Sequence, residues 1–193
     1  CTTEHLFLAD ALENGAGYAR RLYDKHRMQG LLRDYYDSVR ETWESSRHSD
    51  CDLSCPDCLR NYGNRMTHHL LDWRLALDMA EVILQLDLNK DRWLGKADHV
   101  ANTFSALCRA SEMDVNPEQA ASLSAVVLGG SRALILCHPL WHAREGLATP
   151  HQLEAKEALR SKYGTALHVD FCDIRQLSIR PQQYMLQLGQ ADD

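Results

Sequence analysis

Apolar and polar residues recur along the first half of the chain at spacings that predict mainly helices. A short apolar run over residues 6–9 fits a buried strand, and the glycine turn at 14–17 leads into helical periodicity over 18–43. Gly30 marks an expected break between two helices in that stretch. Two further amphipathic helices are predicted by apolar residues at helical spacing, namely Leu71, Leu75, Met79, Val82 and Leu86, and then Ala97, Val100, Phe104 and Leu107.

The pattern changes to short strands beyond Asn116-Pro117. Residues 125–128 and 132–137 are apolar, and the Gly129-Gly130-Ser131 turn between them is typical of a β-hairpin. Short apolar runs bounded by turn residues are consistent with buried strands. We therefore expect a small sheet in the second half of the chain.

A capped helix is predicted between the hairpin and a last strand. Thr149 is followed by Pro150 and, three residues after Thr149, by Gln152, which is the arrangement of a capping box. Gly164 is the expected end of this helix, and residues 166–171 form an apolar strand pattern.

These elements predict the fold class α/β (α+β), with a helix-rich N-terminal half and a short mixed β-sheet with helices in the C-terminal half. We place the boundary between subdomains of residues 1–115 and 116–193. No internal repeat, low-complexity tract or long linker separates the halves, so we expect the second subdomain to pack on the first.

Composition narrows the class of protein further. The 193 residues are 45% hydrophobic, which is enough for a core, and no run approaches the roughly 18 apolar residues of a membrane span. The first residues also lack the pattern of a secretory signal. We therefore expect a soluble, cytoplasmic protein, and the start at Cys1 suggests a piece of a longer polypeptide.

The net charge of −6 argues against a domain that holds nucleic acid mainly by neutralising phosphates. A local basic run nevertheless falls between Arg20 and Arg33. It is either a contact for a phosphate backbone or a solvated helix face partly neutralised by Asp24 and Asp34, and the second interpretation is favoured.

Three of the seven cysteines lie within eight residues, at Cys51, Cys55 and Cys58. An odd, clustered set of thiols is unlike a disulfide scaffold and favours a reducing compartment. Three of the remaining cysteines are expected in the core: Cys108, Cys137 and Cys172. The cluster sits among turn-forming residues that can aim its sulfurs at one point, and soft thiolates select zinc over magnesium or calcium.

A closed zinc site needs a fourth ligand, and histidines are the candidates. His68 is the first choice, because it lies ten residues after Cys58 at the start of an expected helix, and loop-then-helix placement of ligands recurs in zinc modules. His69 and His48 remain alternatives. A redox pair or free thiols are the competing interpretation of the cysteines themselves.

An enzyme is the main alternative to a zinc-stabilised module. Glu154-Ala155-Lys156 has the form of a carboxylate–lysine nuclease motif, but on a helix the two charged side chains diverge by about 200 degrees. Cys137 and His138 are adjacent on a strand, so their side chains point to opposite faces. The sequence contains no phosphate-loop lysine motif. We therefore predict no catalytic residues here, with a metal-dependent nuclease as the alternative.

A family resemblance is carried by the stretch Cys55-Pro56-Asp57-Cys58-Leu59-Arg60-Asn61-Tyr62, by Asn64 and His68, and by Leu71-Asp72-Trp73-Arg74-Leu75-Ala76-Leu77-Asp78. Together these residues resemble the C-terminal zinc-binding domain of MrfA-type DEAD/DEAH-box helicases. The upstream strand and glycine turn are similar as well, so the resemblance spans about the first ninety residues. Many members supply four clustered cysteines, whereas this chain has three, so the resemblance leaves the fourth position to a histidine.

The resemblance implies a structural-zinc accessory domain that follows the motor domains of an ATP-dependent DNA helicase in the same polypeptide. Its partners would be those motor domains and DNA, with no membrane. Relatives of this group act in DNA repair and in anti-phage systems such as DISARM and Druantia, so either pathway is implied.

Overall fold

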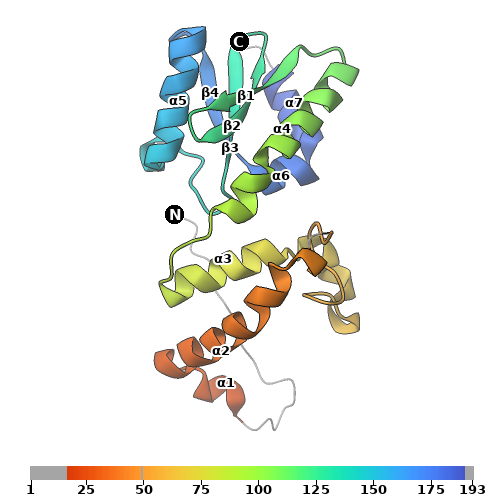
Figure 1. Ribbon diagram of the computed structural model, residues 1–193, viewed down its shortest axis with the longest axis vertical. Coiled ribbons are helices and arrows are strands. Elements are labelled where there is room, and N and C mark those ends of the chain that lie inside the picture. Colours follow the sequence, from red (N-terminus) through yellow and green to blue (C-terminus); the bar gives the residue numbers. More distant parts are fainter. Residues whose placement is uncertain (1–16, 49, 190–193) are drawn as a thin grey trace. The chain divides into compact units, whose positions relative to one another are not determined.

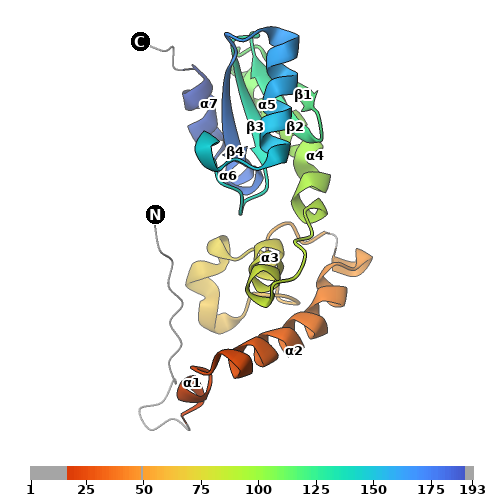
Figure 2. The same ribbon diagram turned by 90° about the vertical axis from the view of Figure 1, so that its left-hand side faces the viewer.

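The computed structural model describes residues 17–48 and 50–189. They fall into two compact units, one ending at Leu88 and one beginning at Asn89, which are described separately (Figures 1 and 2). This division lies well before the boundary expected between residues 115 and 116. The reason is that the long helix α4 (Asp91–Ala110) packs on the sheet of the second unit. Within the described residues, no helix is long and apolar enough to cross a membrane.

The described part of the first unit consists of helices together with the loop over residues 50–61 that carries the three clustered cysteines. Its elements are α1 (Tyr18–Arg21), α2 (Lys25–Trp43), the 3-10 turns η1 (Ser46–His48) and η2 (Tyr62–Leu70), and α3 (Trp73–Leu84). The strand predicted at residues 6–9, and most of the glycine turn after it, lie outside the described residues. Helices α2 and α3 pack against each other around a core that includes Tyr36, Trp43, Trp73 and Leu77.

The break expected at Gly30 does not occur, because α2 runs through it. The helix instead begins after Asp24, whose carboxylate accepts a hydrogen bond from the backbone N–H of Arg27 at 2.9 Å. Gly30 is exposed, and an added Cβ there would meet no atom within 4 Å. A solvent-facing glycine in a helix costs only about 1 kcal/mol relative to alanine, so the surrounding pattern overrides it.

The buried face of α3 also differs from the predicted one. Met79 and Val82 are 46% and 56% exposed, whereas Leu77, Ala80 and Leu84 are buried. This helix is apolar on most of its circumference, so spacing alone could not identify the inner face. The buried face also carries Glu81, which accepts a hydrogen bond from the Tyr36 hydroxyl at 2.7 Å and so ties α3 to α2.

The second unit is a four-stranded mixed sheet covered by helices on both faces. Its elements are α4, β1 (Val115–Ala120), β2 (Leu123–Leu128), β3 (Arg132–Cys137), η3 (Glu145–Leu147), α5 (Pro150–Tyr163), β4 (His168–Asp173), α6 (Ile174–Ile179) and α7 (Pro181–Gly189). Neighbouring strands follow chain order, with antiparallel β1·β2 and β2·β3 pairs and a parallel β3·β4 pair. A parallel pair needs a crossover, which α5 supplies.

The sheet separates α5 from the other helices of this unit (Figure 1). Ala125 and Val127 of β2 and Ile135 of β3 pack toward Ala155 and Leu159 of α5. The alternate residues face α4, where the Ser124 hydroxyl donates to Asp98 at 2.6 Å. Three cysteines expected in the core are indeed buried, namely Cys108, Cys137 and Cys172. The α+β class is thus confirmed.

Most of the predicted strands and the capped helix are confirmed, with one strand missed. The β2–β3 hairpin turns through Gly129 and Gly130, whose φ values of 52° and 72° suit glycine. Strand β1 was not predicted because it contains Pro117, which interrupts a strand pattern. Among the strands that the structure describes, β1 pairs with β2 alone, so it lies at the edge of the sheet, where a residue without an N–H is tolerated.

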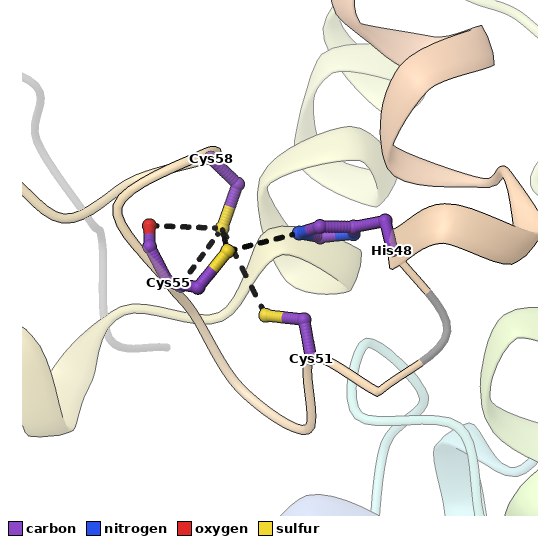
Figure 3. Close-up of side chains that lie close together, drawn as sticks. All are labelled: His48, Cys51, Cys55 and Cys58. Atoms are coloured by element: carbon purple, nitrogen blue, oxygen red, sulfur yellow. Dashed lines mark hydrogen bonds between the residues drawn. The ribbon is translucent and has the colours of Figure 1, made fainter.

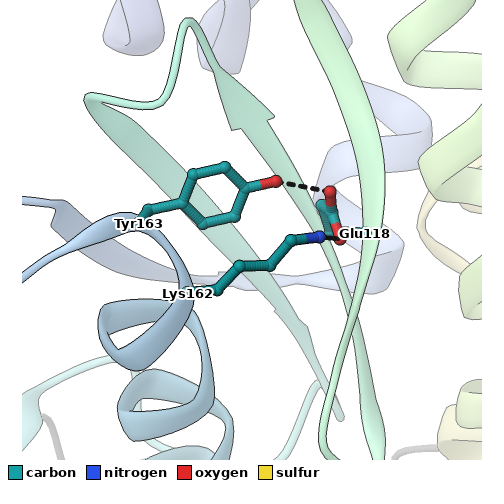
Figure 4. A network of polar contacts seen from close by, with 3 residues as sticks. All are labelled: Glu118, Lys162 and Tyr163. Carbon is teal, nitrogen blue, oxygen red and sulfur yellow. Dashed lines mark hydrogen bonds and ion pairs between the residues drawn. The ribbon is translucent and has the colours of Figure 1, made fainter.

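A polar clamp joins the end of α5 to this edge strand (Figure 4). Glu118 of β1 accepts hydrogen bonds from the Tyr163 hydroxyl and from Lys162 Nζ, the latter at 2.7 Å. These two bonds hold the pKa of the Glu118 carboxyl below its ordinary value, and the bond from Lys162 has the larger effect. The clamp links the first strand of the sheet to the helix that crosses over to the last.

We predict that Glu118→Gln lowers the free energy of unfolding by about 1 kcal/mol at pH 7, because the amide accepts weaker hydrogen bonds than the carboxylate. A depressed folded-state pKa means that the stabilisation is complete above the unfolded-state pKa of about 4.3 and is lost as pH falls through the folded value. Urea titrations between pH 7 and 3 should therefore show wild type and variant converging on the acid side.

Glu157→Gln is the matched control, since Glu157 is an exposed carboxylate on the same helix. It should leave the unfolding free energy unchanged within about 0.5 kcal/mol. A Glu118→Gln deficit that stays constant down to pH 3 would contradict the role of the carboxylate charge.

Candidate metal centre

The end of α2 and the loop after it form the site. After Trp43 the chain makes the 3-10 turn η1, which carries His48, and the backbone N–H of Cys51 donates to the His48 carbonyl at 3.1 Å. Two further backbone bonds, from Cys58 and Arg60 to the Cys55 carbonyl at 3.1 and 3.0 Å, fold the Cys-x-x-Cys segment into a tight turn. Local backbone hydrogen bonds thus bring together one histidine and three cysteines, which are residue types that commonly bind zinc.

The donor atoms of His48, Cys51, Cys55 and Cys58 all lie within 4.8 Å of one another (Figure 3). The Cys51–Cys58 and Cys55–Cys58 sulfur separations are 4.0 and 3.7 Å, and Cys55 Sγ lies 3.4 Å from His48 Nε2. A tetrahedral zinc with bonds near 2.3 Å to sulfur and 2.0 Å to nitrogen would set these edges at about 3.8 and 3.5 Å. The four donors therefore fit a zinc ion.

The orientation of His48 supports the same conclusion. Its Nδ1 lies 2.9 Å from the Trp43 carbonyl oxygen, which can only accept a hydrogen bond, so Nδ1 carries the proton. The lone pair is then on Nε2, which faces Cys55. Histidine ligands of zinc commonly donate their other ring N–H to a carbonyl in this way. The ring is buried and packs edge-on against Trp73, with centroids 5.2 Å apart.

The start of α3 holds the cysteine loop in place. Trp73 donates from its indole Nε1 to the Cys51 carbonyl at 3.0 Å and from its backbone N–H to the Leu53 carbonyl at 3.0 Å. Arg74, also buried, donates to the carbonyl of Asp52. Asp72 caps the helix through its carboxylate. Trp73 and Arg74 belong to the segment that carries the family resemblance, and the structure shows their local role.

The electrostatics of the site require a cation if the cysteines are ionised together. The pKa of Cys51 is raised to about 12, mainly by burial and to a smaller extent by the neighbouring thiols. Burial also raises the pKa of Cys58. Thiolates within 4.0 Å of each other repel, and a divalent ion removes that repulsion. The backbone N–H of Cys55 supplies a further donor to Cys58 Sγ at 3.1 Å.

The structure places His48, and not the predicted His68, beside the three thiols. The Nε2 atom of His68 instead lies 2.9 Å from Asn64 Oδ1 and 3.1 Å from the Asn61 carbonyl. His69 is exposed on η2 and does not join the cluster either. The His68 ring therefore contacts the polar turn at the start of η2, where Asn61 and Asn64 form a capping box.

The candidate nuclease and nucleophile pairs do not converge. Glu154 is exposed on α5, whereas Lys156 is buried on the same helix. Cys137 Sγ contacts the Gln152 amide at 3.5 Å, while His138 Nδ1 accepts the Leu140 backbone N–H at 3.1 Å. Neither pair is arranged for shared chemistry.

Four protein donors would complete a tetrahedral coordination shell, which is the arrangement of structural zinc sites. A zinc ion held by all four would have no position left for a bound water. It would act mechanically, by holding the end of α2 and the cysteine loop in one geometry.

Comparison with known proteins agrees with this geometry. Residues 2–59 match the family model of the MrfA Zn-binding domain. The matched segment includes all four clustered residues and ends before η2, so it is shorter than the ninety residues of the resemblance noted above. No curated protein and no solved structure matches the chain. Residues 2–59 are therefore similar to the MrfA Zn-binding domain, and the Cys3His cluster within them fits zinc.

We predict that protein purified without added metal holds one zinc per chain, and that His48→Ala and Cys55→Ala release it while His68→Ala retains it. Loss of a ligand should weaken zinc binding by more than the roughly 10- to 100-fold typical for loss of a group that only orients one. Elemental analysis after dialysis against a competing chelator measures the retained zinc.

His68→Ala is the matched control, since it removes an imidazole from the same unit without touching the cluster. Zinc retained by His48→Ala and lost by His68→Ala would contradict the ligand assignment. Far-UV circular dichroism of each variant before dialysis confirms that the helices form.

Proposed function

We propose that this chain is the C-terminal accessory module of a cytoplasmic ATP-dependent DNA helicase, which acts in DNA repair or anti-phage defence. The observation that carries the proposal is the closed Cys3His site within a segment that matches the MrfA Zn-binding domain. Residues 55–78 also resemble helicase C-terminal domains, which supports the same function for residues beyond the matched segment.

The zinc site suits a module that transmits force or fixes position. The ion would connect α2 to the cysteine loop, and Trp73 and Arg74 connect that loop to α3. The Tyr36–Glu81 hydrogen bond adds a second tie between the two helices. A unit braced at two points can hold a DNA-contacting or motor-contacting surface at a constant orientation through an ATPase cycle.

ATP hydrolysis is assigned to the motor domains of the same polypeptide. The sequence carries no phosphate-loop lysine motif, and the zinc site has no open position at which water could be activated. A nuclease in the second unit is not favoured, because Glu154 and Lys156 do not share a face. The module would act on the coupling between hydrolysis and strand separation.

We predict that replacing both Cys55 and Cys58 by alanine in the complete helicase preserves most DNA-stimulated ATPase activity and lowers unwinding at least about tenfold. Loss of the ion frees the loop that braces α2 against α3, so hydrolysis continues without productive movement along DNA. Paired ATPase and strand-displacement assays on the same preparation measure the two activities.

Cys108→Ala is the control, because it removes a buried thiol from the other unit without affecting the metal cluster. It should leave the ratio of unwinding to ATPase unchanged. Unwinding that persists at the wild-type level in the zinc-site variant would contradict the accessory role.

A further inference from the structure

The exposed side chains of η2, which we term the η2 surface, include the cation Arg65 and no carboxylate, on a chain that is acidic overall. No aspartate or glutamate occurs between Cys58 and Leu71, although the whole sequence has a net charge of −6. Of the basic residues in this stretch, Arg65 and His69 are exposed, whereas Arg60 and His68 are half-buried and contact Ser54 and Asn64. A local absence of carboxylates allows an anion to approach without the repulsion that the rest of the chain imposes.

The same surface exposes large side chains that are normally covered. Tyr62 is 82% exposed, Met66 80% and Leu70 58%. The Arg65 guanidinium lies over the Tyr62 ring, 4.7 Å from its centroid. An open aromatic face beside an arginine is the pair of groups that binds an unpaired base and its phosphate.

The η2 surface is held in one conformation by its own polar groups. Asn61 and Asn64 cap each other's backbone N–H groups at 3.1 and 2.9 Å. The Asn64 amide also donates to the Leu59 carbonyl at 2.8 Å, directly after the metal-site residue Cys58. A surface that is already ordered loses less conformational entropy on binding. The zinc loop thus anchors the first residues of the surface.

The basic run between Arg20 and Arg33 differs from the η2 surface in that carboxylates lie among its cations. It is interrupted by Asp24, whose carboxylate caps α2, and it contains one strongly exposed aromatic residue, Tyr23. Its charges are those of a solvated helix face. This contrast makes Tyr23 a useful comparison for Tyr62, because both are exposed tyrosines near arginines on the same unit.

We propose that the η2 surface binds single-stranded DNA, with a base stacked on Tyr62 and a phosphate paired with Arg65. Stacking requires an unpaired base, which excludes a duplex as the preferred ligand, and positive charge with an aromatic ring suits a nucleotide better than an apolar protein segment. The choice of DNA over RNA rests on the proposed helicase function, whereas the stacking chemistry does not.

The test is fluorescence anisotropy of a labelled 20-residue oligothymidylate with the zinc-loaded full chain, over a range of salt concentrations. Tyr62→Ala should weaken binding at least about fivefold and leave the salt dependence unchanged, because it removes a stacking platform. Tyr62→Phe should bind like wild type, since it keeps the ring. Arg65→Ala should weaken binding and reduce the slope of log affinity against log salt by about 0.7, the value for one lost phosphate contact on a single strand.

Tyr23→Ala is the matched control and should bind like wild type. Equal weakening by Tyr23→Ala and Tyr62→Ala, equal affinity for a 20-base-pair duplex, or a preference for oligouridylate over oligothymidylate would each overturn the proposal. So would wild-type affinity of Tyr62→Ala, which would assign this surface to a protein contact instead. These outcomes are independent of the paired ATPase and unwinding assays, so the accessory role can stand if the η2 surface fails.

Discussion

Three cysteine sulfurs placed to bind one metal ion impose the strongest constraint on the first unit. Ionised together they would repel, and burial with the neighbouring thiols raises the pKa of Cys51 and of Cys58, which favours the protonated form of both in the absence of a cation. A zinc ion would remove this repulsion, and the apparent free energy of zinc binding in comparable small modules is about 10–16 kcal/mol. An ordinary hydrogen bond contributes about 1 kcal/mol, so the ion outweighs the other contacts of the loop.

The neighbouring structure can be understood from that site. His48 must present Nε2 to the ion, so α2 must end where the Trp43 carbonyl can accept the Nδ1 proton. The loop carbonyls that face away from the ion need donors, and Trp73 and Arg74 at the start of α3 supply them. A small helical unit with a modest apolar core thereby gains a fixed geometry. The second unit is built differently, around a sheet that helices cover on both faces.

Patterns that depend on local sequence predicted the structure well. The β2–β3 hairpin, the capped helix α5 and the clustering of three cysteine sulfurs follow from turn residues, a capping box and thiol spacing, all of which act over a few residues. Strand β4 begins two residues later than expected. The predicted inner face of α3 was wrong. The buried face carries Glu81, which accepts a hydrogen bond from Tyr36, a residue far away in sequence. Such a contact leaves no periodic signal.

The fourth ligand shows the same limit within the site. His68 was preferred by analogy with zinc modules in which the ligands are split between a loop and the following helix. His48 is only three residues before Cys51, a spacing close to those within the cysteine cluster, and this was the available local signal. Two features of the fold position the two histidines. The end of α2 supplies the Trp43 carbonyl to His48, and the polar turn at the start of η2 contacts His68.

The central claim is that zinc is held by one nitrogen and three sulfurs. X-ray absorption spectroscopy at the zinc edge of the purified chain measures that coordination shell directly. We expect three sulfurs at about 2.3 Å and one nitrogen at about 2.0 Å, with the outer-shell scattering of a single imidazole that is lost in His48→Ala and kept in His68→Ala. A shell of four sulfurs, or of two or more light atoms in place of sulfur, would contradict it.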